Sequence, residues 1–392
     1  MEKENKKLPK SKKRIALITI ACMIVTIVFV VMPVFTVIIY NDNFGERFET
    51  AEWMAYSIDE FEGLKVEECP FPSNNGQMLA GYQYFKEDQP CKGVVVLAHG
   101  LGGGGHNTYM DVADFFTSNG YLVFCYDATG NDKSEGDSVE GLPQGVIDLD
   151  YALRYVKQAE EYKDLPIMLF GHSWGGYSVG NVLNCHPDVK AAVLVAGFDS
   201  STDLFEQQGE SIIGFGIKFF MPYVSLYERL KFGKYAACSA TGGFASTDAG
   251  IMIIHSKDDT TVLPENGYDK FYDMYGGDAR FSFIEYEDRG HNYIYYSDAA
   301  KYYRDQLNKD YTAYVEANGG DYNAEIKAAY MEEYLDKSKC YEFDYDLMEK
   351  ILDFYNTYCK ESSVFIDVFG WARNDYAYPV QVETCGFNIK VI

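Results

Sequence analysis

The residues best suited to chemistry surround Ser173, in the sequence G-H-S-W-G at residues 171–175. A strand-like apolar run, residues 166–170, precedes this motif, and a helix-like run, residues 174–185, follows it. A serine at such a strand-to-helix turn adopts a strained backbone, and flanking glycines remove the side chains that would collide there. The pattern therefore predicts a serine hydroxyl that projects from the end of a sheet and can act as a nucleophile.

A serine hydroxyl is a weak nucleophile until a base removes its proton. Three histidines follow Ser173 in the chain: His186, His255 and His291. His186 falls at the end of the predicted helix, and His255 continues a buried apolar strand at 250–254. His291 lies in a turn after the strand-like run 281–286, so we predict that His291 is the base and later the acid that protonates the leaving group.

The acid that orients this histidine should leave the end of the preceding strand. The segment 254–262 carries Asp258 and Asp259 at that place, and Asp259 is preferred because of its D-x-x-V spacing before Pro264. Asp258 is the second candidate and Asp199, after the apolar run 192–196, is the third. The carboxylate would fix the imidazole tautomer and stabilise the imidazolium.

Two backbone N–H groups are needed to stabilise the oxyanion of a tetrahedral intermediate. One should belong to Trp174, directly after the serine. The other should belong to Leu101, in the glycine-rich loop 99–105 that follows the buried run 94–98. The four glycines at 102–105 could also suggest a phosphate-binding loop, but no Gly-Lys-Ser/Thr sequence follows them.

Three motifs together resemble the α/β-hydrolase superfamily, and within it the serine aminopeptidase S33 and monoacylglycerol-lipase-like group. They are H-G-L-G at 99–102, D-A-T-G-N-D-K-S-E-G at 127–136 and G-H-S-W-G-G at 171–176. In the second motif Asp132 stands where this group carries its second glycine. The resemblance extends over roughly residues 65–310 and implies hydrolysis of an ester, thioester or peptide bond through an acyl-enzyme.

The hydrophobic pattern alternates strand-like and helix-like runs from about residue 77 onward. Such alternation, with strands apolar on both faces, is typical of a mostly parallel sheet. The expected fold class is α/β, an α/β-hydrolase fold whose domain spans 65–318. The interval 198–249 follows the sixth strand and is too long for a simple crossover, so it is expected to form a cap over the active site, with a packed helical insertion as the alternative.

The N-terminus carries a second strong signal. Residues 15–40 form an uncharged, apolar run of 26 residues, and about 20 suffice to cross a bilayer core. Residues 1–14 are strongly basic, which predicts a cytoplasmic tail, a single-pass signal-anchor and a catalytic domain on the outer side of the cell membrane. A cleaved signal peptide is the competing interpretation, but its apolar core is typically only about 7–15 residues long.

The remaining segments are assigned by exclusion. Residues 41–64 are expected to form a stalk, and 319–392 a C-terminal addition of unknown role, with helical spacing at 322–336 and 344–360 and strand-like alternation at 363–392. Cysteines could form disulfides in an oxidising compartment. The pairs considered are Cys69 with Cys91, and any two of Cys340, Cys359 and Cys385.

Net charge and composition limit the classes of molecule that the protein is expected to bind. A net charge of −25 argues against nucleic-acid binding, and no Cys or His spacing indicates a metal or cofactor site. The expected partners are an acyl ester or short peptide and, through 15–40, the bilayer. An aminopeptidase would need cap carboxylates for the substrate amine, for which Asp203, Glu206 and Glu210 are available. A tethered, non-catalytic binding protein on a retired hydrolase fold is the alternative from another class.

Overall fold

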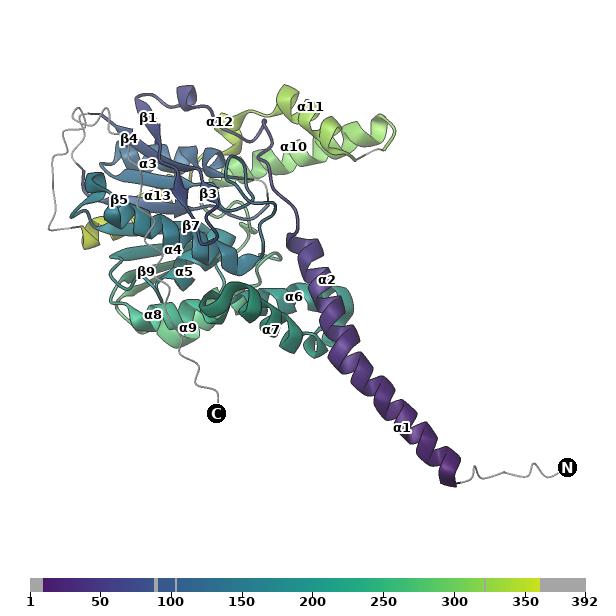
Figure 1. The fold of residues 1–392 in the computed structure, drawn as a ribbon. Helices are drawn as coiled ribbons and strands as arrows, with labels where there is room; N and C mark the ends of the chain where they lie inside the picture. Colours follow the sequence, from purple (N-terminus) through teal and green to yellow (C-terminus); the bar gives the residue numbers. More distant parts are fainter. Residues whose placement is uncertain (1–9, 88–90, 103, 321, 360–392) are drawn as a thin grey trace.

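A central sheet of eight strands organises the computed structural model, which describes residues 10–87, 91–102, 104–320 and 322–359 (Figure 1). The strand order is β1-β4-β6-β5-β7-β8-β9-β10. β4 runs antiparallel to β1 and β6, and every other neighbouring pair is parallel. The predicted mostly parallel sheet is confirmed.

The strands of the sheet are β1 Leu64–Glu68, β4 Gly81–Lys86, β5 Val94–Ala98, β6 Leu122–Tyr126, β7 Ile167–His172, β8 Ala191–Val195, β9 Gly250–Ser256 and β10 Phe281–Tyr286. A short separate hairpin pairs β2 Phe71–Pro72 with β3 Met78–Leu79. The α-helices are α1 Lys10–Thr26, α2 Met32–Phe44, α3 Met110–Ser118, α4 Leu142–Gln158, α5 Trp174–Val182, α6 Ser201–Ile213, α7 Met221–Phe232, α8 Ala240–Ser246, α9 Tyr268–Tyr275, α10 Asp298–Ala317, α11 Ala324–Tyr334, α12 Lys337–Cys340 and α13 Tyr345–Tyr358. The short helical turns are η1 Ile27–Val31, η2 Ile58–Glu60, η3 His106–Thr108, η4 Glu160–Tyr162, η5 Gly214–Phe219, η6 Gly233–Ala237 and η7 Pro264–Asn266.

The central strands are buried on both faces because helices cover each side of the sheet. Along β5, Val94, Val96 and Ala98 pack into one hydrophobic core with α4, α5 and α9. Val95 and Leu97 point the other way and pack into a second core with α3 and α13. The period of two between the faces is that of a pleated strand, and it explains why these strands read as unbroken apolar runs.

The last described helix of the C-terminal addition, α13, packs against the central sheet. In α13, Leu347, Met348, Ile351 and Tyr355 are buried, and the Tyr355 hydroxyl donates a hydrogen bond of 2.6 Å to the Leu169 carbonyl of β7. This helix therefore covers one face of the sheet. The strand-like run predicted at 363–392 lies outside the described residues, and the domain limits stay a prediction.

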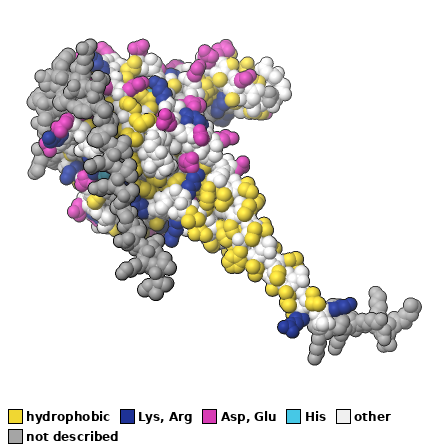
Figure 2. Space-filling view, in the orientation of Figure 1, with side chains coloured by type: hydrophobic (Ala, Val, Ile, Leu, Met, Phe, Trp, Pro, Cys, Tyr) yellow, Lys and Arg dark blue, Asp and Glu magenta, His cyan; other side chains and the backbone are white. Residues whose placement is uncertain are grey.

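α1, η1 and α2 form a single long helix, in which α2 lies against the body and α1 projects away from it (Figure 1). From Ser11 to Phe44 it is long and apolar enough to cross a membrane, by length and composition, and its most apolar stretch is not buried against the protein. Figure 2 shows this projecting surface as predominantly hydrophobic. The helix thus has the properties of a membrane anchor or a signal sequence.

The interval after β8, the sixth strand of the sheet in chain order, is helical. It contains α6, η5, α7, η6 and α8, and α6 and α7 lie alongside α2 (Figure 1).

Cys69, Cys91, Cys340 and Cys359 are free thiols, so the two proposed pairings among them do not form. Cys385 lies outside the described residues.

A buried carboxyl makes the stability of this fold depend on pH. Asp111 of α3 is 7% exposed, and it accepts hydrogen bonds from the Val112 N–H and the Tyr296 hydroxyl. Burial raises its pKa to about 7. An unfolded Asp has a pKa of about 3.9, so the folded state binds the extra proton between these values, and stability falls as pH rises from about 4 to about 7.

We expect Asp111→Asn to remove this loss, because an amide does not ionise. The free energy of unfolding of the wild type should fall between pH 5 and pH 8 relative to that of the variant. The difference should change by an amount on the order of a few kcal/mol over this range. Melting temperatures of the full-length protein across this range measure the change, with exposed Asp353→Asn as the control. Parallel curves for wild type and Asp111→Asn would contradict the prediction.

Candidate active site

Ser173 occupies a strained turn between β7 and α5. Its φ of 57° and ψ of −116° lie in a backbone region that residues other than glycine rarely adopt. The Ser173 N–H donates to the Val195 carbonyl of β8, which holds the turn against the sheet. A Cβ atom at Gly171 would lie 2.3 Å from the Gly175 carbonyl oxygen, and one at Gly175 would lie 1.9 Å from that of Ala98. Both flanking glycines are therefore required by close backbone approach.

The three side chains predicted as a catalytic triad lie together in the structure. The Ser173 Oγ is 2.8 Å from the His291 Nε2, and the His291 Nδ1 is 2.7 Å from the Asp259 Oδ2. Asp259 follows β9 and His291 follows β10, next to it in the sheet. A carboxylate on Nδ1 keeps the proton on that nitrogen, so Nε2 is free to accept the serine proton.

The Asp259 carboxylate is tightly held. Its Oδ1 accepts hydrogen bonds from the backbone N–H groups of Thr261 and Val262. Burial opposes ionisation, but hydrogen bonds from His255 and His291 outweigh it and hold the pKa of Asp259 well below its usual range. Asp259 is therefore a carboxylate at neutral pH.

The two other candidate acids have different partners. The Asp258 Oδ1 accepts hydrogen bonds from the Ser256 hydroxyl and the Gly290 N–H, so it braces the backbone next to His291. Asp199 forms an ion pair with Lys270 and accepts the Thr241 N–H. Neither carboxylate has a hydrogen bond to the His291 imidazole.

A chain of hydrogen bonds joins the glycine-rich loop to the histidine turn through His172. The Gly100 N–H donates to the Tyr109 hydroxyl, which lies 3.2 Å from the His172 Nδ1. His172 Nε2 donates to the His291 carbonyl, at 2.9 Å. Burial, with the nearby His291 ring, lowers the pKa of His172 to about 3. His172 is thus a neutral brace rather than an acid or base.

The residues predicted to supply the oxyanion donors line the same cavity as the serine. Leu101 and Trp174 line a cavity of about 470 Å³ together with Ser173 and His291. Within the described chain, no hydrogen bond is found from the backbone N–H of either residue. Trp174 is also the first residue of α5, where the helix dipole favours negative charge. His99 accepts the Ala128 N–H at Nε2 and donates to the Gly100 carbonyl from Nδ1, so it braces the loop.

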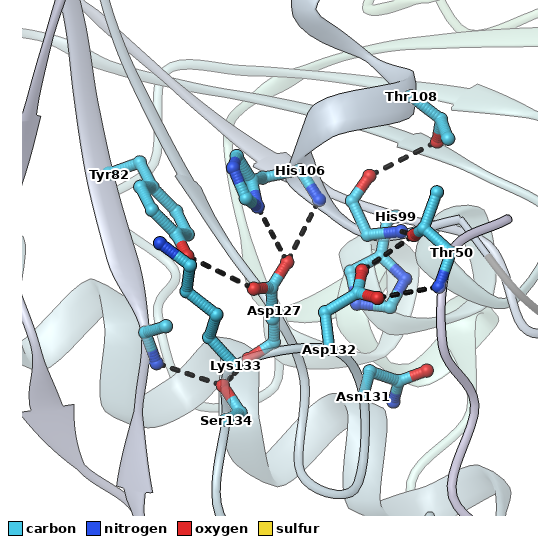
Figure 3. A network of polar contacts seen from close by, with 12 residues as sticks. Thr50, Tyr82, His99, His106, Thr108, Asp127, Asn131, Asp132, Lys133 and Ser134 are labelled. Carbon is cyan, nitrogen blue, oxygen red and sulfur yellow. Dashed lines mark hydrogen bonds and ion pairs between the residues drawn. The ribbon is translucent and has the colours of Figure 1, made fainter. Parts of the chain in front are cut away.

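Asp132 ties the same loop to the chain that leaves the N-terminal helix (Figure 3). Its φ of 39° explains why a glycine is usual at this position in the motif. Its carboxylate accepts hydrogen bonds from the backbone N–H and hydroxyl of Thr50, and the Thr50 Oγ in turn accepts the Gly105 N–H. Beside it, His106 stacks on Tyr82 and contacts Asp127.

Sequence reasoning missed two contributors to this site. His255 was interpreted only as part of a buried strand, yet its Nε2 lies 3.3 Å from the Asp259 Oδ2. Its position four residues before the acid, at the end of β9, was the available signal. Thr50 offered no signal, because its contact with Asp132 joins segments 82 residues apart. Among the described residues, no group of three His, Cys, Asp or Glu side chains could hold a metal ion.

Comparison with known proteins locates the similarity in the first half of the domain. Residues 89–203 match the family described as serine aminopeptidase, S33. This segment includes Leu101 and Ser173 and ends before Asp259 and His291.

Curated relatives share the same region. A caffeoylshikimate esterase of Arabidopsis thaliana is 31% identical over 117 residues, which are 29% of this chain and 35% of the relative. A monoglyceride lipase of Mus musculus is 32% identical over 121 residues, 29% of this chain and 38% of the relative. The chain thus spans somewhat over a third of the length of these relatives.

Solved structures match over a longer stretch at lower identity. An esterase of Pyrococcus furiosus superposes with a TM-score of 0.48 and 15% identity, over 69% of this chain and 98% of the other. An acylaminoacyl peptidase of Pyrococcus horikoshii gives a TM-score of 0.45 and 16% identity, over 60% and 38% of the two chains.

Proposed function

Because the chain belongs to the α/β-hydrolases of the S33 and monoglyceride lipase type, we propose that it is a membrane-anchored serine hydrolase that cleaves carboxylic esters. The observation that carries the proposal is the unbroken hydrogen-bond chain Ser173–His291–Asp259. It starts at a serine held in a strained turn beside two backbone N–H groups.

The geometry supports a two-step acyl transfer. His291 Nε2 takes the proton of Ser173 as its Oγ attacks the carbonyl carbon of the substrate, and Asp259 stabilises the imidazolium that forms. The N–H groups of Leu101 and Trp174 stabilise the oxyanion. His291 then protonates the leaving alcohol, which departs and leaves an ester on Ser173. A water molecule, deprotonated by His291, releases the acid in the same way.

The charged residues of the α6 region favour an ester over an aminopeptidase substrate. Asp203 forms an ion pair with Lys270, while Glu206 and Glu210 share Lys218. Each carboxylate already has a cation, and none of the three lines the cavity that holds Ser173. A substrate amine would lack a free carboxylate there, whereas an uncharged ester needs none. The esterase and lipase names of the relatives point the same way.

The proposed topology follows from the basic tail before the apolar helix. Residues 15–40 would cross the cell membrane with the N-terminus in the cytoplasm, so that α6 and α7 face the outer side. In intact cells, added protease should digest a C-terminal epitope tag and spare an N-terminal one. The reverse result would contradict this orientation, and loss of the N-terminal tag from the mature protein would indicate a cleaved signal peptide.

Ser173→Ala should abolish labelling by a fluorophosphonate probe, because the probe reacts only with an activated serine. Hydrolysis of p-nitrophenyl esters should fall by a factor on the order of 10⁶. Ser178→Ala, one turn further along α5, is the matched control and should still be labelled. A folded wild-type protein that the probe does not label would favour a non-catalytic binding protein instead.

Substitution of Asp259 should lower kcat far more than substitution of the neighbouring Asp258. Asp259→Asn loses the charge that fixes the His291 tautomer, and kcat should fall about 10⁴-fold. Asp258→Asn keeps an acceptor for the Gly290 N–H and does not contact the imidazole, so its loss should be at most about tenfold, within the range of a single lost hydrogen bond. Steady-state kinetics on one ester measure both. Equal losses, or a larger one at Asp258, would refute the assignment of the acid.

A further inference from the structure

A second cavity, of about 560 Å³, lies between the N-terminal helix and the α6–α7 region. Most of the lining side chains are apolar. Part of its wall comes from α2, through Phe35, Thr36, Ile39, Asn43 and Phe44. The opposite wall comes from the α6–α7 region, including Leu204, Gln208, Ile212 and Ile213, together with Leu101 and Leu142. This size falls within the range of about 300–1,000 Å³ that is usual for small-molecule sites.

This apolar cavity adjoins the one that contains Ser173. Leu101, Leu142, Leu204 and Gln208 line both cavities. Leu101 is also a proposed oxyanion donor, so the shared wall lies where a substrate carbonyl would bind. An acyl group whose carbonyl carbon meets Ser173 therefore has an apolar space directly beside it for its chain.

The N-terminal helix is fixed against the α6–α7 region rather than hanging free. In η1 the Met32 N–H donates to Ile27, and Pro33 has no N–H to offer the Val28 carbonyl. The Tyr223 hydroxyl of α7 donates to that carbonyl instead, at 2.9 Å. A carbonyl without a donor is costly in lipid, so this bond fixes the position of α7 on the helix.

Further contacts extend the same interface toward Phe44. The Tyr227 hydroxyl donates to the Asn41 Oδ1, and the Tyr40 hydroxyl donates to the buried Glu228. The rings of Phe35 and Phe220 lie 5.8 Å apart between their centres. Helix and cavity wall therefore form one packed unit.

The length of the helix places part of this unit inside the bilayer. The contacts with α7 begin at Val28, and the apolar stretch before it, residues 15–27, is about 20 Å long at about 1.5 Å per residue. The hydrocarbon core is about 30 Å thick. The helix can cross it only if residues that contact α7 also lie within the outer leaflet.

A segment that lies within the bilayer needs an apolar surface, and α6 and η5 expose one. Ile212 is 82% exposed, Phe215 69% and Phe219 63%. These side chains would be unfavourable in water and favourable in lipid. The one cation of η5, Lys218, forms ion pairs with Glu206 and Glu210. Ile212 also lines the cavity, so the cavity lies next to the proposed lipid-facing surface.

We propose that the membrane helix forms one wall of the acyl-binding site, so that a long-chain ester lipid enters from the outer leaflet with its acyl chain in the cavity between α2 and α6. This rests on the proposed hydrolase function and names its substrate class. The anchor is then part of the substrate site as well as a tether.

Full-length protein in liposomes tests the proposal with two esters, a soluble p-nitrophenyl butyrate and a palmitoyl ester dissolved in the same bilayer. Ile39→Trp fills the cavity from α2. The ratio of kcat/KM for the long ester to that for the short one should fall about 10- to 200-fold, as for other changes of fit in a hydrophobic pocket. Ile38→Trp, the next residue and exposed outside the cavity, is the matched control and should change the ratio by no more than about twofold.

The outcomes separate the two proposals. If the wild type hydrolyses neither ester, the hydrolase function fails. If it hydrolyses both and Ile39→Trp leaves the ratio unchanged, the acyl site fails and the function stands.

A second measurement covers an Ile39→Trp protein that does not fold. Ser173→Ala in liposomes is irradiated with a monoacylglycerol that carries a diazirine in its acyl chain, and crosslinks are mapped by mass spectrometry. We expect crosslinks on the cavity side, at Ile39 and Ile213, that excess unlabelled monoacylglycerol suppresses. Equal, unsuppressed crosslinking at Ile38 and Ile39 would indicate surrounding lipid only and would overturn the proposal.

Discussion

The backbone of Ser173 is the constraint on which the rest of the site depends. A residue other than glycine in such a conformation costs on the order of 1–3 kcal/mol and persists only where its surroundings over-determine it. Here the parallel sheet does so, because the Ser173 N–H is bonded to β8 and Gly175 packs against the Ala98 carbonyl of β5. The same sheet carries Asp259 and His291 at the ends of β9 and β10, so that one rigid edge holds all three side chains.

The sequence allowed the local parts of this arrangement to be predicted. The central strands carry unbroken apolar runs because both faces are buried, and the serine and the acid follow two of these runs. The histidine follows β10, a less buried strand at the edge of the sheet. Position after a strand-like run and short motif spacing were enough to select Ser173, Asp259 and His291 as candidates. These signals are short-range, and each can be recognised within a few residues.

Contacts between distant segments could not be predicted in this way. His172 supports the His291 carbonyl 119 residues away, and Tyr355 bonds to a strand 186 residues before it. The N-terminal helix is a similar case. Its composition indicates a membrane span, and Pro33 indicates a helix carbonyl without its usual donor. Nothing in residues 15–40 indicates that Tyr223 supplies that donor. Such partners become visible only when the chain is folded.

The link from Thr50 through Asp132 to Gly105 has a practical consequence for how the protein is produced. A protein with a long apolar N-terminal helix is commonly truncated just beyond that helix to obtain a water-soluble fragment. A cut after residue 50 would remove the Thr50 hydroxyl, and the glycine loop beside the nucleophile would lose its bonded neighbour. Kinetic constants from such a fragment would describe a different active-site loop from that of the full-length protein.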